Sequence, residues 1–209
     1  MKLVILGAGG HAKVVLSLAL DLGYQVLGLL DDDAEKWGQN LMGFPVAGPL
    51  SRIWELAQRD VEFVLAIGDN GVRQKLAEEH QGVPWATLVH PKAYVHSSVT
   101  LGEGTVVMAG AIVQPMAVVG KHVIVNTGAV VEHDCWVGDY AHIAPGAKLG
   151  GGVWVGAGAL VGIGAVIIPG RSVGDKAVLG GGSVVVRNIP SGAVAYGVPA
   201  RVVRQEELS

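Results

Sequence analysis

The sequence is poor in the residues that mark several large classes of protein. Only one of its 209 residues is a cysteine, Cys135, which excludes an intrachain disulfide and a metal site built from several cysteines. Aromatic residues make up 5% and charged residues 16% of the chain, a composition that disfavours a disordered chain, a coiled coil and a helical bundle. The net charge of −3 gives no electrostatic reason to expect nucleic acid as a partner.

Long apolar runs are also absent, although half of the residues are hydrophobic. Glycine or a polar residue interrupts every stretch before it reaches the roughly 18 residues of a membrane span, so we expect no membrane segment. The opening MKLVILGAGG has too short an apolar core for a signal peptide, and we therefore expect a cytoplasmic protein. The chain is rich in glycine, with 32 residues, which is roughly twice the usual share.

The distribution of charge divides the chain near His90. Residues 1–90 carry 7 Lys and Arg against 11 Asp and Glu, whereas residues 91–209 carry 8 against 7. The pattern of apolar residues changes at the same place. We therefore predict two domains, at 1–90 and at 91–209, the second of which includes a C-terminal tail.

The first domain shows the pattern of a parallel α/β fold. Apolar runs at Lys2–Leu6 and Gln25–Leu30 flank a glycine turn and an amphipathic segment, which is typical of a β-turn-α-β unit. The order continues with a helix, a strand and a helix, which predicts a Rossmann-like domain with about four parallel strands. These later segments lie at Leu50–Arg59, Glu62–Ile67 and Val72–His80.

The second domain is built on a six-residue repeat. Every sixth residue from Val95 to Val185 is Val, Leu or Ile, at sixteen positions without exception, and the residue four places later is mostly small. This spacing predicts a solenoid of short strands, in which the aliphatic side chain points inward and three hexapeptides close one coil. The repeats make about five coils of about 18 residues, and we expect most of the glycines to serve the turns.

A glycine motif follows the first predicted strand. The run GAGGHA at 7–12 matches the G-x-G-x-x-[GA] pattern whose backbone N–H groups hold phosphates, and Asp31-Asp32-Asp33 follows about twenty residues later. The ligand of such a motif is NAD or a sugar nucleotide, and the alternative is a tight turn without a ligand. His11 at the helix start favours a sugar nucleotide, because it can donate to a phosphate. Asp33 has the simpler alternative of capping a turn.

The sharpest cluster of chemical groups lies at residues 132–142. Three of the five acidic residues in the repeats and two of their four histidines fall in this short stretch. His133 and Asp134 occupy positions at the exposed corner of a hexapeptide, where a substrate can reach them. An imidazole beside a carboxylate is suited to act as a general base. The alternative is an exposed polar corner without a role, and this is the interpretation that we favour for His96 and His122.

Metal binding and nucleophilic catalysis are the rival chemistries for these residues. Hexapeptide prisms of γ-class carbonic anhydrases use a close histidine pair, and the intervals between His122, His133 and His142 do not match it, so we expect no metal. Cys135 falls in the small inward position that it shares with Ala129. We interpret it as a packing residue rather than a nucleophile.

The whole chain resembles the two-domain hexapeptide acyltransferases that acetylate nucleotide-linked amino sugars. These are the UDP-4-amino-sugar and GDP-perosamine N-acetyltransferases, with the sialic acid O-acetyltransferases as relatives. The resemblance covers about residues 3–203 and is carried by GAGGHAKVV, LLDD, AIGDN with Arg73, NTGAVVEHDC and the closing Gly197–Ala200 run. It implies a left-handed parallel β-helix for the second domain, acetyl-CoA as co-substrate and a homotrimer.

The resemblance also implies roles for individual residues. His133 would take the proton from the sugar amine as the amine attacks the thioester, with Asp134 raising its basicity, and no acyl-enzyme would form. His142 would contact the thioester region of acetyl-CoA. The first domain would hold the phosphates and the nucleoside of the sugar nucleotide through Gly9, Gly10, His11, Asp31, Asp32 and Gly68.

The repeat spacing adds a track for the coenzyme. Pro145, Ile163 and Gly181 are 18 residues apart, so they occupy one corner of successive coils just beyond His142. A mean hydropathy of +0.45 leaves too much apolar surface for a monomer. In a trimer, the active site would lie between the His133 corner of one subunit and the coenzyme track of the next.

The sequence therefore predicts acetyl-CoA-dependent N-acetylation of a nucleotide-linked amino sugar. The alternatives are O-acetylation of a sialic acid, a dinucleotide-dependent oxidoreductase and a non-catalytic nucleotide sensor. The oxidoreductase is the least favoured, because the repeats do not provide the second nucleotide-binding half that would hold the nicotinamide. The nucleotide, the sugar and the acetylated position stay open at this point.

Overall fold

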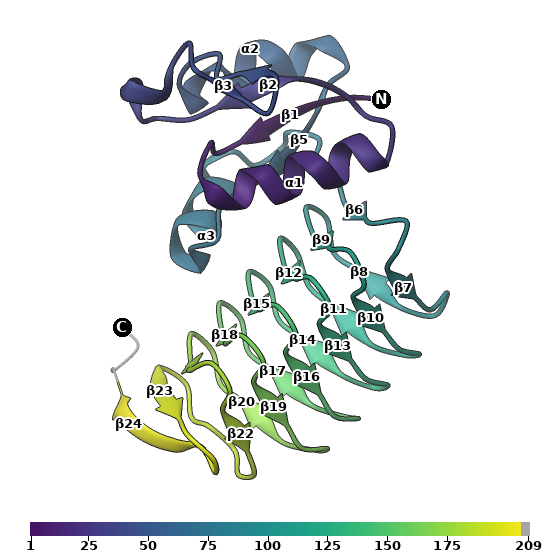
Figure 1. The fold of residues 1–209 in the computed structure, drawn as a ribbon, viewed down its shortest axis with the longest axis vertical. Coiled ribbons are helices and arrows are strands. Elements are labelled where there is room, and N and C mark those ends of the chain that lie inside the picture. Colours follow the sequence, from purple (N-terminus) through teal and green to yellow (C-terminus); the bar gives the residue numbers. More distant parts are fainter. Residues whose placement is uncertain (206–209) are drawn as a thin grey trace.

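Two structural units make up the protein, and the computed structural model describes residues 1–205. Figure 1 shows an α/β unit that stacks against one side of a long parallel β-solenoid. The types of the two units and their order along the chain are those that the sequence predicts. Residues 206–209, at the end of the predicted C-terminal tail, lie outside the described residues.

The α/β unit is built on a three-stranded parallel sheet. Its order is β2-β1-β5, with β1 at Lys2–Leu6, β2 at Gln25–Leu30 and β5 at Glu62–Leu65. The prediction of about four strands is wrong, because Val46 and Trp85 form only isolated bridges at the edges of the sheet. Each of these residues follows a proline. Because proline has no N–H group to donate, the pairing does not extend backwards into a ladder.

Two well-formed helices flank this sheet close to where the pattern places them. They are α1 (Gly10–Asp21) and α3 (Asn70–Glu79). The Asp69 carboxylate caps α3 by accepting a hydrogen bond from the Val72 N–H group at 2.8 Å. Such a cap satisfies one of the N–H groups that the first turn of a helix leaves unpaired.

The single helix predicted at Leu50–Arg59 is wrong in its continuity. The segment consists of two 3-10 turns around one α-helical turn. Of its residues only Leu50 and Ile53 are buried, and an anchor at every third residue suits the three-residue period of a 3-10 turn. The remaining elements of the unit are η1 (Ala34–Lys36), β3 (Asn40–Leu41), β4 (Phe44–Pro45), η2 (Leu50–Arg52), α2 (Ile53–Leu56) and η3 (Ala57–Arg59).

The solenoid consists of short strands in three sheets, one on each side of a triangular prism, and we name each sheet by its first strand. The β6 sheet contains β6 (Leu88–Val89), β9 (Val106–Val107), β12 (Ile124–Val125), β15 (His142–Ile143), β18 (Leu160–Val161), β21 (Val178–Leu179), β23 (Ala193–Tyr196) and β24 (Arg201–Gln205). The β7 sheet contains β7 (Tyr94–Val95), β10 (Ile112–Val113), β13 (Val130–Val131), β16 (Lys148–Leu149), β19 (Val166–Ile167) and β22 (Val184–Val185). The β8 sheet contains β8 (Thr100–Leu101), β11 (Val118–Val119), β14 (Trp136–Val137), β17 (Trp154–Val155) and β20 (Ser172–Val173).

Successive coils pair in parallel at an interval of 18 residues as far as β22, as the repeat predicts, and the last pairing, of β21 with β23, has an interval of 16 residues. Val113 lies beside Val131, and Val131 lies beside Leu149. These residues, the second of each strand, fill the interior and are at most 1% exposed. Cys135 occupies a small inward position, where its Sγ donates to the Gly150 carbonyl at 3.2 Å and burial raises the pKa of its thiol. This environment supports packing rather than nucleophilic attack.

One turn position accounts for many of the glycines. Every sixth residue from 104 to 182 has a positive φ, which residues with a side chain adopt only at a cost. Aspartate and asparagine tolerate this region better than most residues, so a polar side chain can be displayed there. Asp134 does so with a φ of 59°. The residues that replace glycine at this position are Met116, His122, Asp134, Tyr140 and Lys176.

The apolar contact of the α/β unit with the solenoid covers the beginning of the β6 sheet. Helix α1 lies between its own sheet and the solenoid (Figure 1). Leu16 of α1 shares an apolar core with Leu88, Val106 and Ile124, the first residues of β6, β9 and β12. Further along the same sheet, His142 of β15 is half-buried at the junction of the two units. The contact between the units therefore places a polar side chain beside the end of the apolar interface.

We expect Leu149→Ala to lower the free energy of unfolding by about 2–5 kcal/mol, because it opens a cavity at an inward position. Lys148 is the matched control, since it precedes Leu149 on the same strand and is exposed. Lys148→Ala should change the free energy of unfolding by less than about 0.5 kcal/mol. Urea denaturation of both variants measures the difference. Equal losses would contradict the inward placement of every sixth residue.

Candidate active site

A cavity of about 500 Å³ lies at the carboxyl edge of the parallel sheet, where the chain leaves β1, β2 and β5. Open α/β sheets bind their ligands at this edge. The residues that the sequence assigns to the sugar nucleotide all line the cavity, and they are Gly9, Gly10, His11, Asp31, Asp32 and Gly68. The fold therefore brings these six residues together, while what they bind stays a prediction.

The glycines of this cavity are of two kinds. Gly7 has a φ of 107°, and a Cβ atom on it would lie 3.0 Å from the Ile67 side chain, so the fold itself requires glycine there. A Cβ atom on Gly9, Gly10 or Gly68 would meet no protein atom within 4 Å. Packing does not explain these three glycines. Their lack of a side chain favours close approach of a ligand to the backbone.

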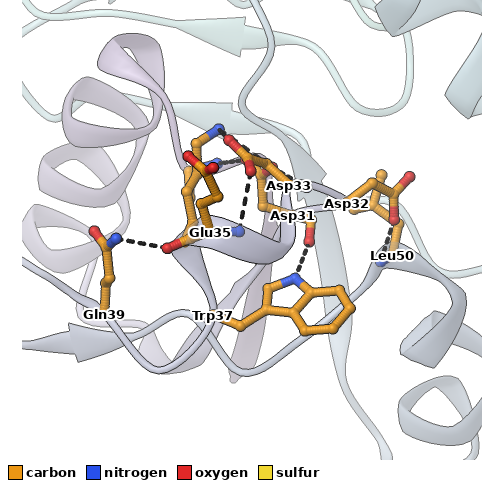
Figure 2. Close-up of polar contacts among 9 residues, drawn as sticks. Asp31, Asp32, Asp33, Glu35, Trp37, Gln39 and Leu50 are labelled. Atoms are coloured by element: carbon orange, nitrogen blue, oxygen red, sulfur yellow. Dashed lines mark hydrogen bonds and ion pairs between the residues drawn. The ribbon is translucent and has the colours of Figure 1, made fainter.

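The two aspartates of the cavity differ in how their carboxylates are engaged. Asp31 accepts a hydrogen bond from the Ala8 N–H group at 2.7 Å and forms an ion pair with Lys36 at 3.1 Å. Burial opposes ionisation of Asp31, but hydrogen bonds from backbone N–H groups and Lys36 outweigh it and lower the pKa. Asp32 accepts a hydrogen bond from the Leu50 N–H group at 2.9 Å (Figure 2). Asp31 therefore braces the glycine turn, whereas Asp32 is the better candidate for contact with a ligand.

Asp33 has the structural role that the sequence allowed for it. Its carboxylate accepts a hydrogen bond from the Glu35 N–H group at 3.1 Å and caps η1. Figure 2 shows that the Trp37 indole N–H group donates to the Asp31 carbonyl, at 2.7 Å. These two contacts tie η1 to the end of β2 and so shape one wall of the cavity.

The cations of the cavity are not among the residues that the sequence predicts. Lys36 and Lys75 both line it. Lys36 pairs with Asp31, while the Lys75 amine lies 3.7 Å from the Glu79 carboxylate on the exposed side of α3. No motif links these lysines to the glycine turn, and Lys75 reaches the cavity only because the fold brings α3 there. Their positive charge suits the phosphate groups of a nucleotide.

His11 and His142 meet at the junction of the two units, with ring centroids 6.3 Å apart. His142 Nε2 lies 3.0 Å from the amide nitrogen of Asn126, and its ring also hydrogen-bonds the backbone of Gly68. Burial, assisted by the charge of Arg73, lowers the pKa of both histidines to about 4. Both imidazoles are therefore neutral at physiological pH. The Nε2 atom of His11 is buried without a hydrogen-bond partner among residues 1–205.

His133 and Asp134 stand on a different corner of the solenoid, between β13 and β14. His133 Nδ1 lies 2.7 Å from Asp134 Oδ2, and both side chains are more than half exposed. This hydrogen bond is the main cause that raises the pKa of His133. Because Nδ1 is engaged with the carboxylate, Nε2 is the ring nitrogen that can accept a proton from a substrate.

The next coil makes room for the His133 ring. Gly151 follows His133 by one coil, and a Cβ atom on Gly151 would lie 2.5 Å from His133 Nε2. Glycine at this position therefore leaves the basic nitrogen uncovered. Gly151 is not among the predicted site residues, although the 18-residue spacing points to it. Asn126 is not among them either, because its diagonal position beside His142 follows only from the fold.

The predicted coenzyme track exists as a stacked corner of the prism. The Gly164 N–H group donates to the Pro145 carbonyl at 3.0 Å, and the Gly182 N–H group donates to the Ile163 carbonyl at 2.8 Å. Pro145, Ile163 and Gly181 therefore follow one another on successive coils. The Ile163 residue is 66% exposed, which leaves an apolar contact beside a position without a side chain. Binding of a coenzyme along this corner stays a prediction.

The cavity and the His133 corner are separate within one chain. The cavity adjoins the β6 sheet through the contact of Gly68 with His142, whereas His133 lies at the corner shared by the β7 and β8 sheets. In the described part of the chain, neither His133 nor Asp134 belongs to the lining of the cavity. Within one chain, the cavity and the His133 corner therefore do not form a single site.

The other histidines of the repeats have local contacts. His96 Nδ1 accepts a hydrogen bond from the Ser98 N–H group at 3.1 Å. The expectation of an exposed corner is wrong for His122, because its side chain is buried against the rings of Trp85 and Tyr140. Within residues 1–205, no three His, Cys, Asp or Glu side chains are grouped so that they could hold a metal ion. In the same range, no helix combines the length and the apolarity that crossing a bilayer requires.

Comparison with known families matches both structural units. The family of the PglD N-terminal domain matches residues 2–80, and the bacterial transferase hexapeptide family, defined on six repeats, matches residues 116–151. Among curated proteins, UDP-N-acetylbacillosamine N-acetyltransferase of Bacillus subtilis (strain 168) is 42% identical over 113 residues, which cover 52% of this chain and 51% of that protein. Uncharacterized protein L142 of Acanthamoeba polyphaga mimivirus is 35% identical over 100 residues. The matched regions thus span 20% to 51% of these curated relatives.

Solved structures match over nearly the full length. A histidine-to-asparagine variant of perosamine N-acetyltransferase from Caulobacter crescentus, in complex with CoA and GDP-perosamine, is 39% identical with a TM-score of 0.93 over 98% of each chain. The acetyltransferase domain of PglB from Neisseria gonorrhoeae FA1090, in complex with acetyl coenzyme A, is 38% identical with a TM-score of 0.90 over 97% of this chain and 98% of that chain. With both units matched, the chain belongs to the two-domain hexapeptide-repeat sugar N-acetyltransferases.

Proposed function

We propose that the protein transfers the acetyl group of acetyl-CoA to the amino group of a nucleotide-linked amino sugar. The observation that carries this proposal is the cavity beside His142, which gathers ligand-accessible glycines, aspartates and lysines at the edge of the sheet. The relatives that bind CoA with GDP-perosamine, or acetyl coenzyme A, support N-acetylation over O-acetylation of a sialic acid. They also favour it over dinucleotide-linked oxidation and over nucleotide sensing.

In this proposal, the cavity binds the sugar nucleotide through backbone and charge. Gly9 is the N-cap of α1 and provides no side-chain cap, so the first N–H groups of the helix are available to phosphate oxygens. Lys75 adds positive charge at the same cavity. Asp32 accepts hydrogen bonds from the nucleoside hydroxyl groups. Gly10 and Gly68 leave the space in which the ligand lies.

His133 is the general base of the proposed reaction. The amine nitrogen of the sugar attacks the thioester carbonyl, and His133 Nε2 takes the proton that the amine loses. A C–N bond forms, the C–S bond breaks, and coenzyme A leaves as the thiol after protonation. Asp134 stabilises the imidazolium through its hydrogen bond to Nδ1. The acetyl group passes directly to the amine, which agrees with the buried position of Cys135.

The proposed site is completed by a second copy of the chain. His133 is exposed at one corner of the prism, while the cavity, His142 and the coenzyme track lie elsewhere on the chain. A homotrimer with cyclic symmetry brings the His133 corner of one subunit to the cavity and the track of the next, and so repeats the same site three times. Ile163, exposed on the track, is then covered by acetyl-CoA or by the neighbouring prism.

We expect His133→Ala to lower kcat by roughly 10²- to 10⁴-fold, which is the usual contribution of a general base. The side chain is exposed, so its removal should not unfold the protein. His96→Ala is the control, because it also removes a histidine of the repeats, a half-buried one, but leaves the proposed site intact. Steady-state rates with a nucleotide-linked amino sugar, together with size-exclusion profiles, provide the measurement. A near wild-type kcat in folded His133→Ala would place the base elsewhere, with His142 as the first candidate.

We expect Asp134→Asn to move the acid limb of the kcat profile to lower pH. His133 must be neutral to accept a proton, so activity falls as the pH drops below its pKa, and Asp134 raises that pKa. Asparagine also tolerates the positive φ at this position, so the backbone should stay in place. Profiles of kcat between about pH 5 and 9 measure the limb in both proteins. Titration of the substrate amine contributes equally to both profiles. An acid limb that stays at the same pH in the variant would therefore argue against His133 and Asp134 as the catalytic pair.

A mixture of two inactive variants should regain activity if the site is shared between subunits. Gly68→Phe fills the cavity, since a side chain at Gly68 meets no protein atom nearby, and His133→Ala removes the base. In trimers reassembled from equal amounts, about one site in four combines an intact cavity with an intact His133. Rates after reassembly, compared with each variant alone, test this expectation. No recovery in mixed trimers would mean that each site draws on a single chain.

A further inference from the structure

Arg73 is a buried cation held by carbonyl groups. It is 1% exposed, and within residues 1–205 no carboxylate forms an ion pair with it. Burial lowers its pKa to about 10, so the guanidinium remains charged at physiological pH. Such a charge is costly to bury unless its donors are satisfied. The partners of its donors therefore indicate what the residue is for.

These partners come from the wall of the cavity and from the solenoid. The first group belongs to the loop after β5, where Nη1 donates to the Ile67 carbonyl at 3.0 Å and to the Gly68 carbonyl at 3.3 Å. The second group belongs to the solenoid, where Nε donates to the His122 carbonyl at 2.8 Å and Nη2 donates to the Tyr140 carbonyl at 2.6 Å. One side chain thus links the two structural units.

Asn70 extends the link to a third coil. Arg73 Nη2 donates to Asn70 Oδ1 at 2.7 Å, and the Asn70 amide in turn donates to the Gly158 carbonyl at 2.9 Å. His122, Tyr140 and Gly158 are 18 residues apart, so the two side chains bind the same corner of three successive coils. This regular pattern fixes the height of the loop along the solenoid axis.

The height of that loop sets the geometry around His142. Gly68 contacts both Arg73 and the His142 ring, and His142 follows Ala141, whose carbonyl accepts from Arg73 at 3.4 Å. His11 lies on the other side of the same junction. A displacement of the loop would therefore move the cavity relative to the coil that begins the coenzyme track.

We infer that Arg73 is a positioning residue, which holds the Gly68 wall of the cavity against the coil of His142 so that the sugar nucleotide and acetyl-CoA meet in one continuous site. This inference rests on the proposed function. Only arginine offers five donors in a planar fork, and lysine keeps the charge with a single nitrogen. Six carbonyl and amide oxygens surround Arg73. The single ammonium group of a lysine has three N–H donors and cannot bond all six.

The test uses Arg73→Lys in the full chain. We expect kcat to fall by about 10- to 100-fold, because a displacement of about 1 Å between reacting groups is sufficient for such a loss. The affinity for acetyl-CoA, measured alone by calorimetry, should change by less than about threefold, since the track residues Pro145, Ile163 and Gly181 do not contact Arg73. Ile53→Val is the matched control, because it loosens the buried core of the same unit at a residue that does not itself line the cavity.

Hydrogen exchange supplies a readout that does not depend on activity. In Arg73→Lys, exchange should rise by at least tenfold in both linked segments, 67–70 and 140–142, and stay unchanged in β13 on the far corner. If the wild-type protein acetylated no nucleotide-linked amino sugar, this joint change would still support the link, and the proposed function alone would fail. Unchanged exchange, or an equal fall of kcat in Ile53→Val, would overturn the positioning role.

Discussion

The hydrogen bonds between coils, at a fixed interval of 18 residues, are the constraint on which the rest of the structure depends. Each inward aliphatic residue stacks on its equivalent in the next coil, so the three corners of the prism run straight along its axis. This register places Gly151 beside His133 and aligns the carbonyls that Arg73 and Asn70 bind. Local chemistry at a corner is therefore set by residues one coil away, which sequence neighbours alone do not reveal.

The second constraint is that the α/β unit covers only one sheet of the prism. Its helix α1 buries an apolar face against the first strands of the β6 sheet, and this apolar contact ends near His142, while Asn70 of α3 reaches one coil further to the Gly158 carbonyl. The cavity, His11 and His142 consequently share one side of the molecule, while His133 stays exposed on another corner. This division is why the proposed chemistry requires two copies of the chain, since burying one sheet leaves the base free to serve a neighbouring cavity.

Three histidines show how their surroundings divide the chemistry. His133 is exposed beside a carboxylate, and its hydrogen bond to Asp134 raises its pKa. His11 and His142 are largely withdrawn from water and lie near the Arg73 charge, and burial is the main cause that lowers their pKa to about 4. The carboxylate beside the first favours its charged form, whereas the other two are neutral at physiological pH and interact through hydrogen bonds. In the proposed reaction, His133 therefore accepts the proton, whereas His11 and His142 only bind the substrates.

The sequence by itself determined the solenoid, its 18-residue period and the α/β order, because all three depend on a local periodicity of apolar residues that can be read directly from the chain. It also identified the cavity residues, since the glycine turn and the aspartates after β2 meet at one sheet edge by the topology of parallel strands. The sequence predicted too many strands in the sheet, where single prolines stop the pairing at both edges. It also predicted one continuous helix at 50–59, where too few apolar residues are buried to hold it. Only the tertiary structure revealed Lys75 at the cavity, Asn126 beside His142 and Arg73 between the units, because these contacts join segments whose separation follows no local period.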